Sequence, residues 1–123
     1  MWVSASVYEP LYEHNERKYM RFVIGESHAA IVRAKQDAKK HLIRGDRVDD
    51  PLDGRVLLVK IPWRYNRPMC KVEGLTPISG LKKGDRVDLD VEFTGAWNVN
   101  GYSGYTWKLN VVRELNSDGN VYE

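Results

Sequence analysis

The sequence predicts a mostly β-sheet domain with one α-helix, and three observations lead to that expectation. Apolar and polar residues alternate strictly over residues 87–93, and apolar or alternating runs also occupy residues 2–8, 18–24 and 55–61. Alternation with a period of two places one set of side chains on a buried sheet face. Only residues 27–43 show the spacing of an amphipathic helix. At 123 residues the chain has the length of one domain.

The first two strands are expected to pair as a hairpin. Residues 2–8 form the first strand, and its core face carries Val3, Ala5 and Val7. Pro10 is expected to end it, because proline cannot donate to a strand ladder. Residues 18–24 are again apolar and aromatic, and the polar connection 13–17 lets them fold back on the first strand.

The helix is expected to begin at Ser27 as its N-cap and to end near Ile43, with Gly45 after it. Its apolar stripe consists of Ile31, Ala34, Ala38 and Leu42. Its other side is basic, with Arg33, Lys35, Lys39, Lys40 and Arg44. Such a face can contact phosphates, but it is also typical of a solvated helix surface. Both interpretations stay open.

The middle of the chain alternates between loops and strands. Residues 46–54 are acidic and contain proline and glycine, so they predict a surface loop before the strand 55–61. A further strand is expected at about residues 69–73. Residues 81–86 then form a turn that leads into the half-buried strand 87–93.

A glycine- and asparagine-rich arm is expected at residues 95–104, outside regular strand structure. The extended pattern resumes over residues 105–113, so the arm is part of a long hairpin. Residues 1–115 therefore form the single predicted domain. Residues 116–123 have few apolar side chains and are expected to be a flexible tail.

Composition and charge distribution indicate which classes of protein the chain can belong to. The net charge is only +2, but it is segregated: residues 60–71 carry four cations and no acid, whereas residues 85–92 carry four acids and one arginine. The only cysteine, Cys70, excludes an intramolecular disulfide and a cysteine-based zinc site. The N-terminal residues do not resemble a secretory signal, and no apolar run approaches the roughly 20 residues of a membrane-spanning helix. We expect a cytoplasmic protein without membrane association.

No catalytic or cofactor-binding signature stands out, so an enzyme is not expected. The three histidines share no ligand or nucleophile spacing: His14, His28 and His41. Three carboxylates on one predicted strand face could hold a divalent cation, as a metal-dependent nuclease requires: Asp88, Asp90 and Glu92. The same pattern is typical of any solvated antiparallel strand. We therefore predict neither a metal site nor a cofactor.

Two segments combine aromatic and cationic side chains. Between two predicted strands, residues 60–71 contain Lys60, Trp63, Arg64, Tyr65, Arg67 and Lys71. In and beside the arm lie Trp97, Tyr102 and Lys108. Aromatic faces stack on unpaired bases, and cations bind the phosphates of the backbone. These nine residues are the candidate nucleic-acid contacts, although the aromatics could instead pack into the domain.

Residues 81–115 (LKKGDRVDLDVEFTGAWNVNGYSGYTWKLNVVREL) resemble the closing part of OB-fold single-stranded DNA-binding proteins, particularly small phage-type ones. In that family a Lys-Gly-Asp turn enters a strand, an aromatic arm follows, and a last strand closes the barrel. The resemblance implies an OB-like, five- to six-stranded antiparallel barrel. Two features depart from it: the helix follows only two predicted strands, and the last residues lack a long acidic tip.

These observations together predict a sequence-tolerant single-stranded DNA-binding protein acting in replication or recombination, in the cytoplasm of the host cell if it is phage-encoded. An RNA-binding module would use the same aromatics and cations. A protein-interaction module would use the exposed aromatics as anchors. A homodimer would gain avidity by linking two sites, but no residue pattern indicates one.

Overall fold

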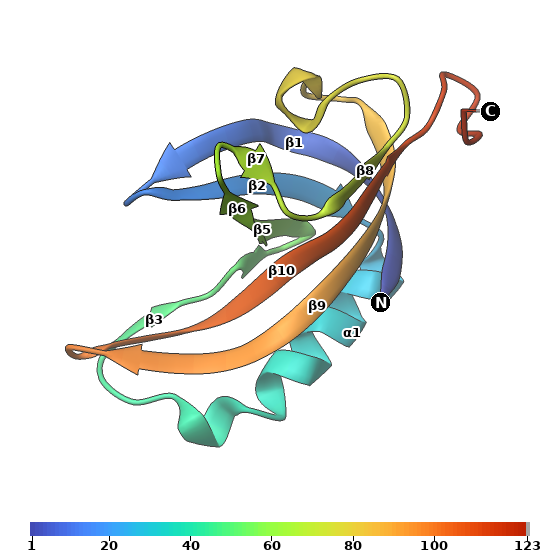
Figure 1. Ribbon diagram of the computed structural model, residues 1–123. Helices are drawn as coiled ribbons and strands as arrows, with labels where there is room; N and C mark the ends of the chain where they lie inside the picture. Colours follow the sequence, from blue (N-terminus) through green and yellow to red (C-terminus); the bar gives the residue numbers. More distant parts are fainter. Residues whose placement is uncertain (123) are drawn as a thin grey trace.

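The computed structural model describes residues 1–122 (Figure 1). Its long strands are β1 (Trp2–His14), β2 (Arg17–Ile24), β5 (Val56–Ile61), β9 (Arg86–Val99) and β10 (Tyr102–Glu114). Its short strands are β3 (Arg47–Asp49), β4 (Leu52–Asp53), β6 (Trp63–Arg64), β7 (Arg67–Pro68) and β8 (Lys71–Glu73). The helix α1 covers Glu26–Asp37, and the 3-10 turns η1 and η2 cover Lys40–Leu42 and Ile78–Gly80.

The long strands form one curved sheet. β1 pairs antiparallel with β2 and β9, β2 pairs with β5, and β9 pairs with β10. A parallel pairing between Lys60 of β5 and Lys108 of β10 joins the two ends of this order. The sheet thus curls into a barrel-like ring in the order β1–β2–β5–β10–β9 (Figure 1). The prediction of a mostly β domain with one α-helix is confirmed, although the ring has one parallel junction.

Alternate side chains of every long strand fill the ring. Met20 and Phe22 of β2, Leu57 and Val59 of β5, and Leu89 of β9 are completely shielded from solvent. The residues between them on each strand are at least partly exposed. Removing the inward set from water is the main term that stabilises the fold. The intervening outward set is free to build a surface site.

β1 does not end at Pro10 as predicted. It continues to His14 and pairs with β2 as far as Arg17, with irregular register on both sides of Glu9. Proline is tolerated at such a bulge, because its missing N–H is not required there by the ladder. The expected hairpin therefore forms, but it is longer, and it places Tyr12 directly opposite Tyr19.

The helix register predicted from the sequence is wrong. α1 begins after Gly25, which is its N-cap, and ends at Asp37. Its buried residues are Ala29, Val32 and Gln36, whereas Ile31 is 43% exposed and the rest of the predicted stripe is exposed as well. The helix turns a polar glutamine inward because that side chain hydrogen-bonds to the buried Trp107 and to Asp50.

Residues 95–104 are not an irregular arm. β9 and β10 stay paired along their whole length and are joined at Asn100 and Gly101, whose φ values are 49° and 82°. Positive φ at both turn positions is what a two-residue hairpin turn of type I′ requires. β3 runs parallel to the end of β10 and adds a third strand to the arm. The arm is therefore a sheet extension of fixed geometry.

The chain after β10 turns back on itself. Leu115 forms an isolated antiparallel bridge with Val121, and the Asn116 carboxamide oxygen accepts from the backbone N–H groups of Asp118 and Asn120, both at 3.0 Å. Glu123, the last residue of the predicted tail, lies outside the described residues. Within residues 1–122, no helix has the length and apolar character needed to cross a membrane.

Candidate nucleic-acid interface

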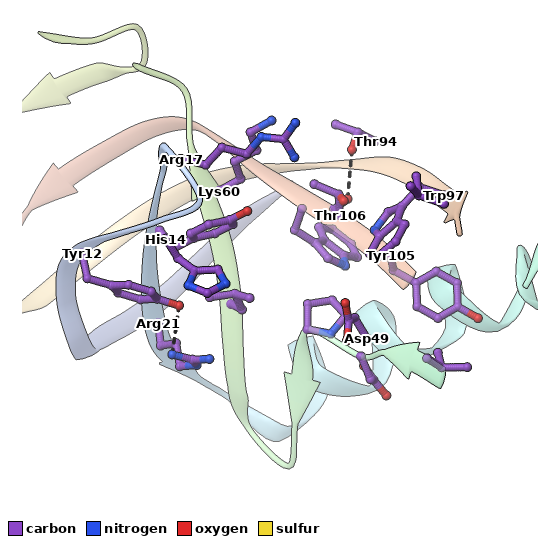
Figure 2. Close-up of a pocket in the computed structure, with 17 residues that line it drawn as sticks. Tyr12, His14, Arg17, Arg21, Asp49, Lys60, Thr94, Trp97, Tyr105 and Thr106 are labelled. Carbon is purple, nitrogen blue, oxygen red and sulfur yellow. Dashed lines mark hydrogen bonds between the residues drawn. The ribbon is translucent and has the colours of Figure 1, made fainter. Parts of the chain in front are cut away.

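A cleft of about 890 Å³ opens on the outer face of the ring (Figure 2). Its floor is made by outward side chains of β2 and β5. One side is the end of the β1–β2 hairpin. The other side is the β9–β10 arm together with residues 48–51. The cleft therefore exists because the two long hairpins extend on either side of the β2–β5 surface.

A row of four directly paired residues crosses the ring at this cleft. Tyr12 pairs with Tyr19, Tyr19 with Lys60, and Lys60 with Lys108. The rings of Tyr12 and Tyr19 lie 5.8 Å apart, a normal distance for aromatic contact. Two tyrosines are thus followed by two lysines at paired positions of adjacent strands. The row ends at Glu92, whose carboxylate is 3.9 Å from the Lys108 ammonium.

Further cations surround the tyrosine pair. Arg21 contacts the carboxylate of Glu9, donates to the Tyr12 hydroxyl at 3.1 Å, and places its guanidinium 5.6 Å from the centre of the Tyr12 ring. Figure 2 shows Arg17 and His14 near the same end of the cleft. This end therefore presents positive charge next to aromatic faces.

The opposite wall is aromatic. Trp97 lies across the hairpin from Gly104, and a Cβ at position 104 would come within 2.7 Å of the indole and 2.8 Å of the Asp49 carbonyl oxygen. Only glycine allows Trp97 and β3 to pack this closely. Tyr105 lies next to it, with its ring 6.1 Å from that of Phe93 (Figure 2). Trp97 and Tyr105 thus line the side of the cleft away from the tyrosine pair.

A chain of hydrogen bonds that starts at the buried Trp107–Gln36 pair holds the loop that borders the cleft. The Trp107 indole N–H donates to Gln36 Oε1 at 3.0 Å, and the Gln36 amide donates to Asp50 Oδ1 at 3.1 Å. The same Asp50 oxygen accepts from the Leu52 N–H at 2.9 Å, and Arg33 pairs with the other oxygen. Gln36 is completely buried. These hydrogen bonds therefore link the helix, the barrel strand β10 and residues 48–51.

The protonation states follow from these surroundings. Burial disfavours ionisation of Asp50, but the hydrogen bonds from Arg33, Leu52 and Gln36 outweigh it and lower the pKa of its carboxyl group. Burial raises the pKa of both Tyr12 and Tyr105, so both phenols stay protonated near neutral pH and keep a donor hydrogen. The cleft therefore offers neutral aromatic donors rather than negative charge at those two positions.

The structure brings together three of the nine residues proposed from the sequence. Lys60 and Trp97 line the cleft, and Lys108 is directly paired with Lys60. Tyr102 lies at the end of the arm, where the Arg47 guanidinium is 5.6 Å from its ring centre. Lys71 is on β8, 3.0 Å from the Glu73 carboxylate. Neither Tyr102 nor Lys71 lines the cleft.

The other four form the separate β6–β7 hairpin. Trp63 is partly buried against the core, whereas Tyr65 is 81% exposed. Arg64 and Arg67 are exposed and pair with each other across this hairpin. The turn between the strands gives the two aromatics different surroundings, although their spacing of two predicts one shared face.

Sequence reasoning missed most of the tyrosine side of the cleft. The missed lining residues include Tyr12, Arg17, Tyr19, Arg21 and Tyr105. Tyr19 and Arg21 alternate with the buried Met20 and Phe22, so the outward face of the strand 18–24 could have indicated them. Tyr12 could not be found in this way, because Pro10 predicts that the first strand ends before it.

The carboxylates on β9 are each engaged in a structural contact. The chain's amino group donates to Asp90 at 2.9 Å, Ser4 donates to Asp88 at 3.3 Å, and Asn110 donates to Glu92 at 3.2 Å. Among residues 1–122 no group of three or more histidine, cysteine or acidic side chains is arranged to hold a metal ion.

Burial raises the pKa of the Cys70 thiol, which disfavours the reactive thiolate.

Comparison of the chain with protein-family models, with curated proteins and with solved structures finds no match.

Proposed function

We propose that this protein binds single-stranded DNA with little sequence preference, with the strand lying in the cleft between the β1–β2 and β9–β10 hairpins. The observation that carries the proposal is the row of Tyr12, Tyr19, Lys60 and Lys108 across three neighbouring strand pairs. Stacking on tyrosine is independent of base identity, and ammonium groups bind the phosphates that link the stacked bases. Replication or recombination is the setting in which such binding protects exposed strands.

The strand order supports an OB-like barrel as the fold behind this function. β1, β2, β5, β9 and β10 would be its five strands, and the parallel pairing of the third with the fifth closes the ring. OB folds bind oligonucleotides on the face of strands 2 and 3, between the loop that joins strands 1 and 2 and the loop that joins strands 4 and 5. The cleft occupies the corresponding place. The helix lies between the second and third of these strands, which departs from the family pattern.

The test is a fluorescence titration with a labelled single-stranded DNA, its duplex and its RNA counterpart at two salt concentrations. We expect the single-stranded DNA to bind most tightly. Replacing Tyr19 or Trp97 with alanine should weaken its binding by about 1–3 kcal/mol each, the usual loss for one stacked base. Trp2→Ala is the matched control, because Trp2 is 47% exposed but lies against Arg113, away from the cleft.

Phosphate contacts are tested by the salt dependence. For single strands, the logarithm of the affinity falls with the logarithm of salt by about 0.7 for each neutralised phosphate. Lys60→Met should therefore lower that slope by about 0.7 without abolishing binding. Equal binding of RNA would favour the RNA-binding alternative. Absence of nucleic-acid binding at low salt would refute the proposal and favour a protein partner.

A further inference from the structure

The β6–β7 hairpin is a small two-stranded unit outside the main sheet. Its base is fixed: the Met69 N–H donates to the Pro62 carbonyl oxygen at 2.8 Å, and Trp63 packs against the core. Only the two turn residues, Tyr65 and Asn66, lie beyond the paired residues Arg64 and Arg67. The hairpin thus presents its tip from a firmly attached base.

The residues at this tip are locally unfavourable. Tyr65 has a φ of 55°, in the left-handed region that bulky side chains rarely adopt. Arg64 and Arg67 are directly opposite each other, and like charges in that position repel. Neither arginine takes part in any of the ion pairs found among residues 1–122. Glycine at position 65 and an acid opposite either arginine would relieve these costs.

A ligand that needs an exposed aromatic ring between two cations accounts for this arrangement. Tyr65 is the most exposed of the large apolar and aromatic side chains, at 81%. At this exposure the ring is open to solvent among residues 1–122, so it can cover one side of a stack but cannot enclose a base. The open end of a base-paired stack has one free aromatic face with a phosphate chain on either side of it. An exposed ring on a turn that carries one arginine on each strand is complementary to that surface.

The hairpin also adjoins one end of the cleft. The ammonium group of Lys18 lies 5.3 Å from the centre of the Trp63 ring. Lys18 alternates in β2 with Arg17 and Tyr19, which line the cleft, so its side chain points to the other face of the sheet, near the end of the ring. Figure 1 shows the hairpin beside β2 and β5, the two strands that form the cleft floor. A strand that leaves the cleft past Arg17 would reach the hairpin by passing around the end of β2.

We propose that the tip of the β6–β7 hairpin caps the terminal base pair where single-stranded DNA joins a duplex. Tyr65 stacks on that base pair, and Arg64 and Arg67 bind the phosphates of its two strands. This inference rests on the proposed binding of the single strand in the cleft. It adds a preference for junctions over uninterrupted single strands.

The experiment compares three probes: a single strand, a blunt duplex, and a duplex that carries the same single strand as an overhang, made with either polarity. A 2-aminopurine at the terminal base pair reports stacking directly. We expect one overhang polarity to bind about tenfold more tightly than the single strand alone, as one added stacking contact allows. Binding should also change the 2-aminopurine fluorescence.

Tyr65→Gly should remove the junction preference and the 2-aminopurine response while leaving the affinity for the single strand unchanged. The variant should also unfold at a higher urea concentration, because glycine accepts a φ of 55° without steric cost. Asn66→Gly is the matched control, since it changes the neighbouring turn residue, whose φ is 60°, and keeps the aromatic ring. That control should bind all three probes like the unmodified protein.

The outcomes separate this inference from the proposed function. If the single strand binds but neither overhang is preferred, or if Tyr65→Gly keeps the preference, the junction-capping role is wrong and the cleft proposal stands. If no probe binds, both are wrong.

Discussion

At the level of single residues, close packing around Gly104 sets the position of Trp97 in the wall of the cleft. The indole of Trp97 and the backbone of Asp49 both occupy the space that a side chain at position 104 would need. Trp97 is thereby packed directly against the backbone of the arm. A stacking platform that is already ordered loses less entropy when it binds a base.

Gly104→Ala should therefore disturb both stability and the cleft. The new Cβ would lie 2.7 Å from the indole, so the ring or β3 must move, at a cost of about 1–3 kcal/mol for overpacking. We expect urea denaturation to show this loss and the emission of Trp97 to shift. Gly25→Ser provides the control, because a Cβ there meets nothing closer than 4.0 Å and serine is a good N-cap. A Gly104→Ala protein with normal stability would contradict the packing described for the arm.

At the level of an element, β9 and α1 differ in how well the sequence predicts which face is buried. The strand β9 follows from the sequence, because Val87, Leu89 and Val91 alternate with charged residues and only one face can be buried. The sequence of the helix does not single out one buried face in this way. Its apolar residues permit several stripes, and the buried one is selected by Gln36, whose partners Trp107 and Asp50 lie 71 and 14 residues away in the chain. No local pattern contains that information.

Gln36→Leu tests this attachment. The change leaves the Trp107 indole N–H buried without an acceptor and removes a donor to Asp50, so the free energy of unfolding should fall by about 1–3 kcal/mol. Ile31→Ala, at a position that the apolar stripe predicted to be buried, should cost no more than roughly 0.5 kcal/mol because the side chain is 43% exposed. Chemical denaturation of both variants gives the comparison. A larger loss for Ile31→Ala would mean that the helix register is incorrect.

The cleft itself is a property of the whole molecule. Its lining residues come from four separate stretches of chain: the first hairpin, residues 48–51, β5 and the arm. The sequence identified Lys60 and Trp97 because each stands in a segment with other aromatics or cations. It did not identify Tyr12, since the continuation of β1 past Pro10 depends on a bulge in its pairing with β2.

Acid should weaken the molecule through Asp50. A carboxyl group whose pKa is lowered by folding contributes stability above its ordinary value of 3.8, and that contribution is lost as the pH falls through the lower pKa of the folded state. Protonation also removes the charge that pairs with Arg33 at the cleft border. Urea denaturation between about pH 6 and pH 2 should show the loss. In Asp50→Asn the decline below the ordinary value should be smaller, and an identical decline would exclude Asp50 as its source.

β10 has a consequence for how the chain reaches its folded state during synthesis. It pairs with β9, β5, β3 and β8, and all four precede it in the chain. Until residues 102–114 have left the ribosome, β5 and β9 have no strand between them and the ring stays open. Pairings between distant segments also slow folding, because the connecting chain must first be ordered. The nascent protein is thus expected to carry unpaired strand edges until late in its synthesis, the stage at which aggregation is the main competing process.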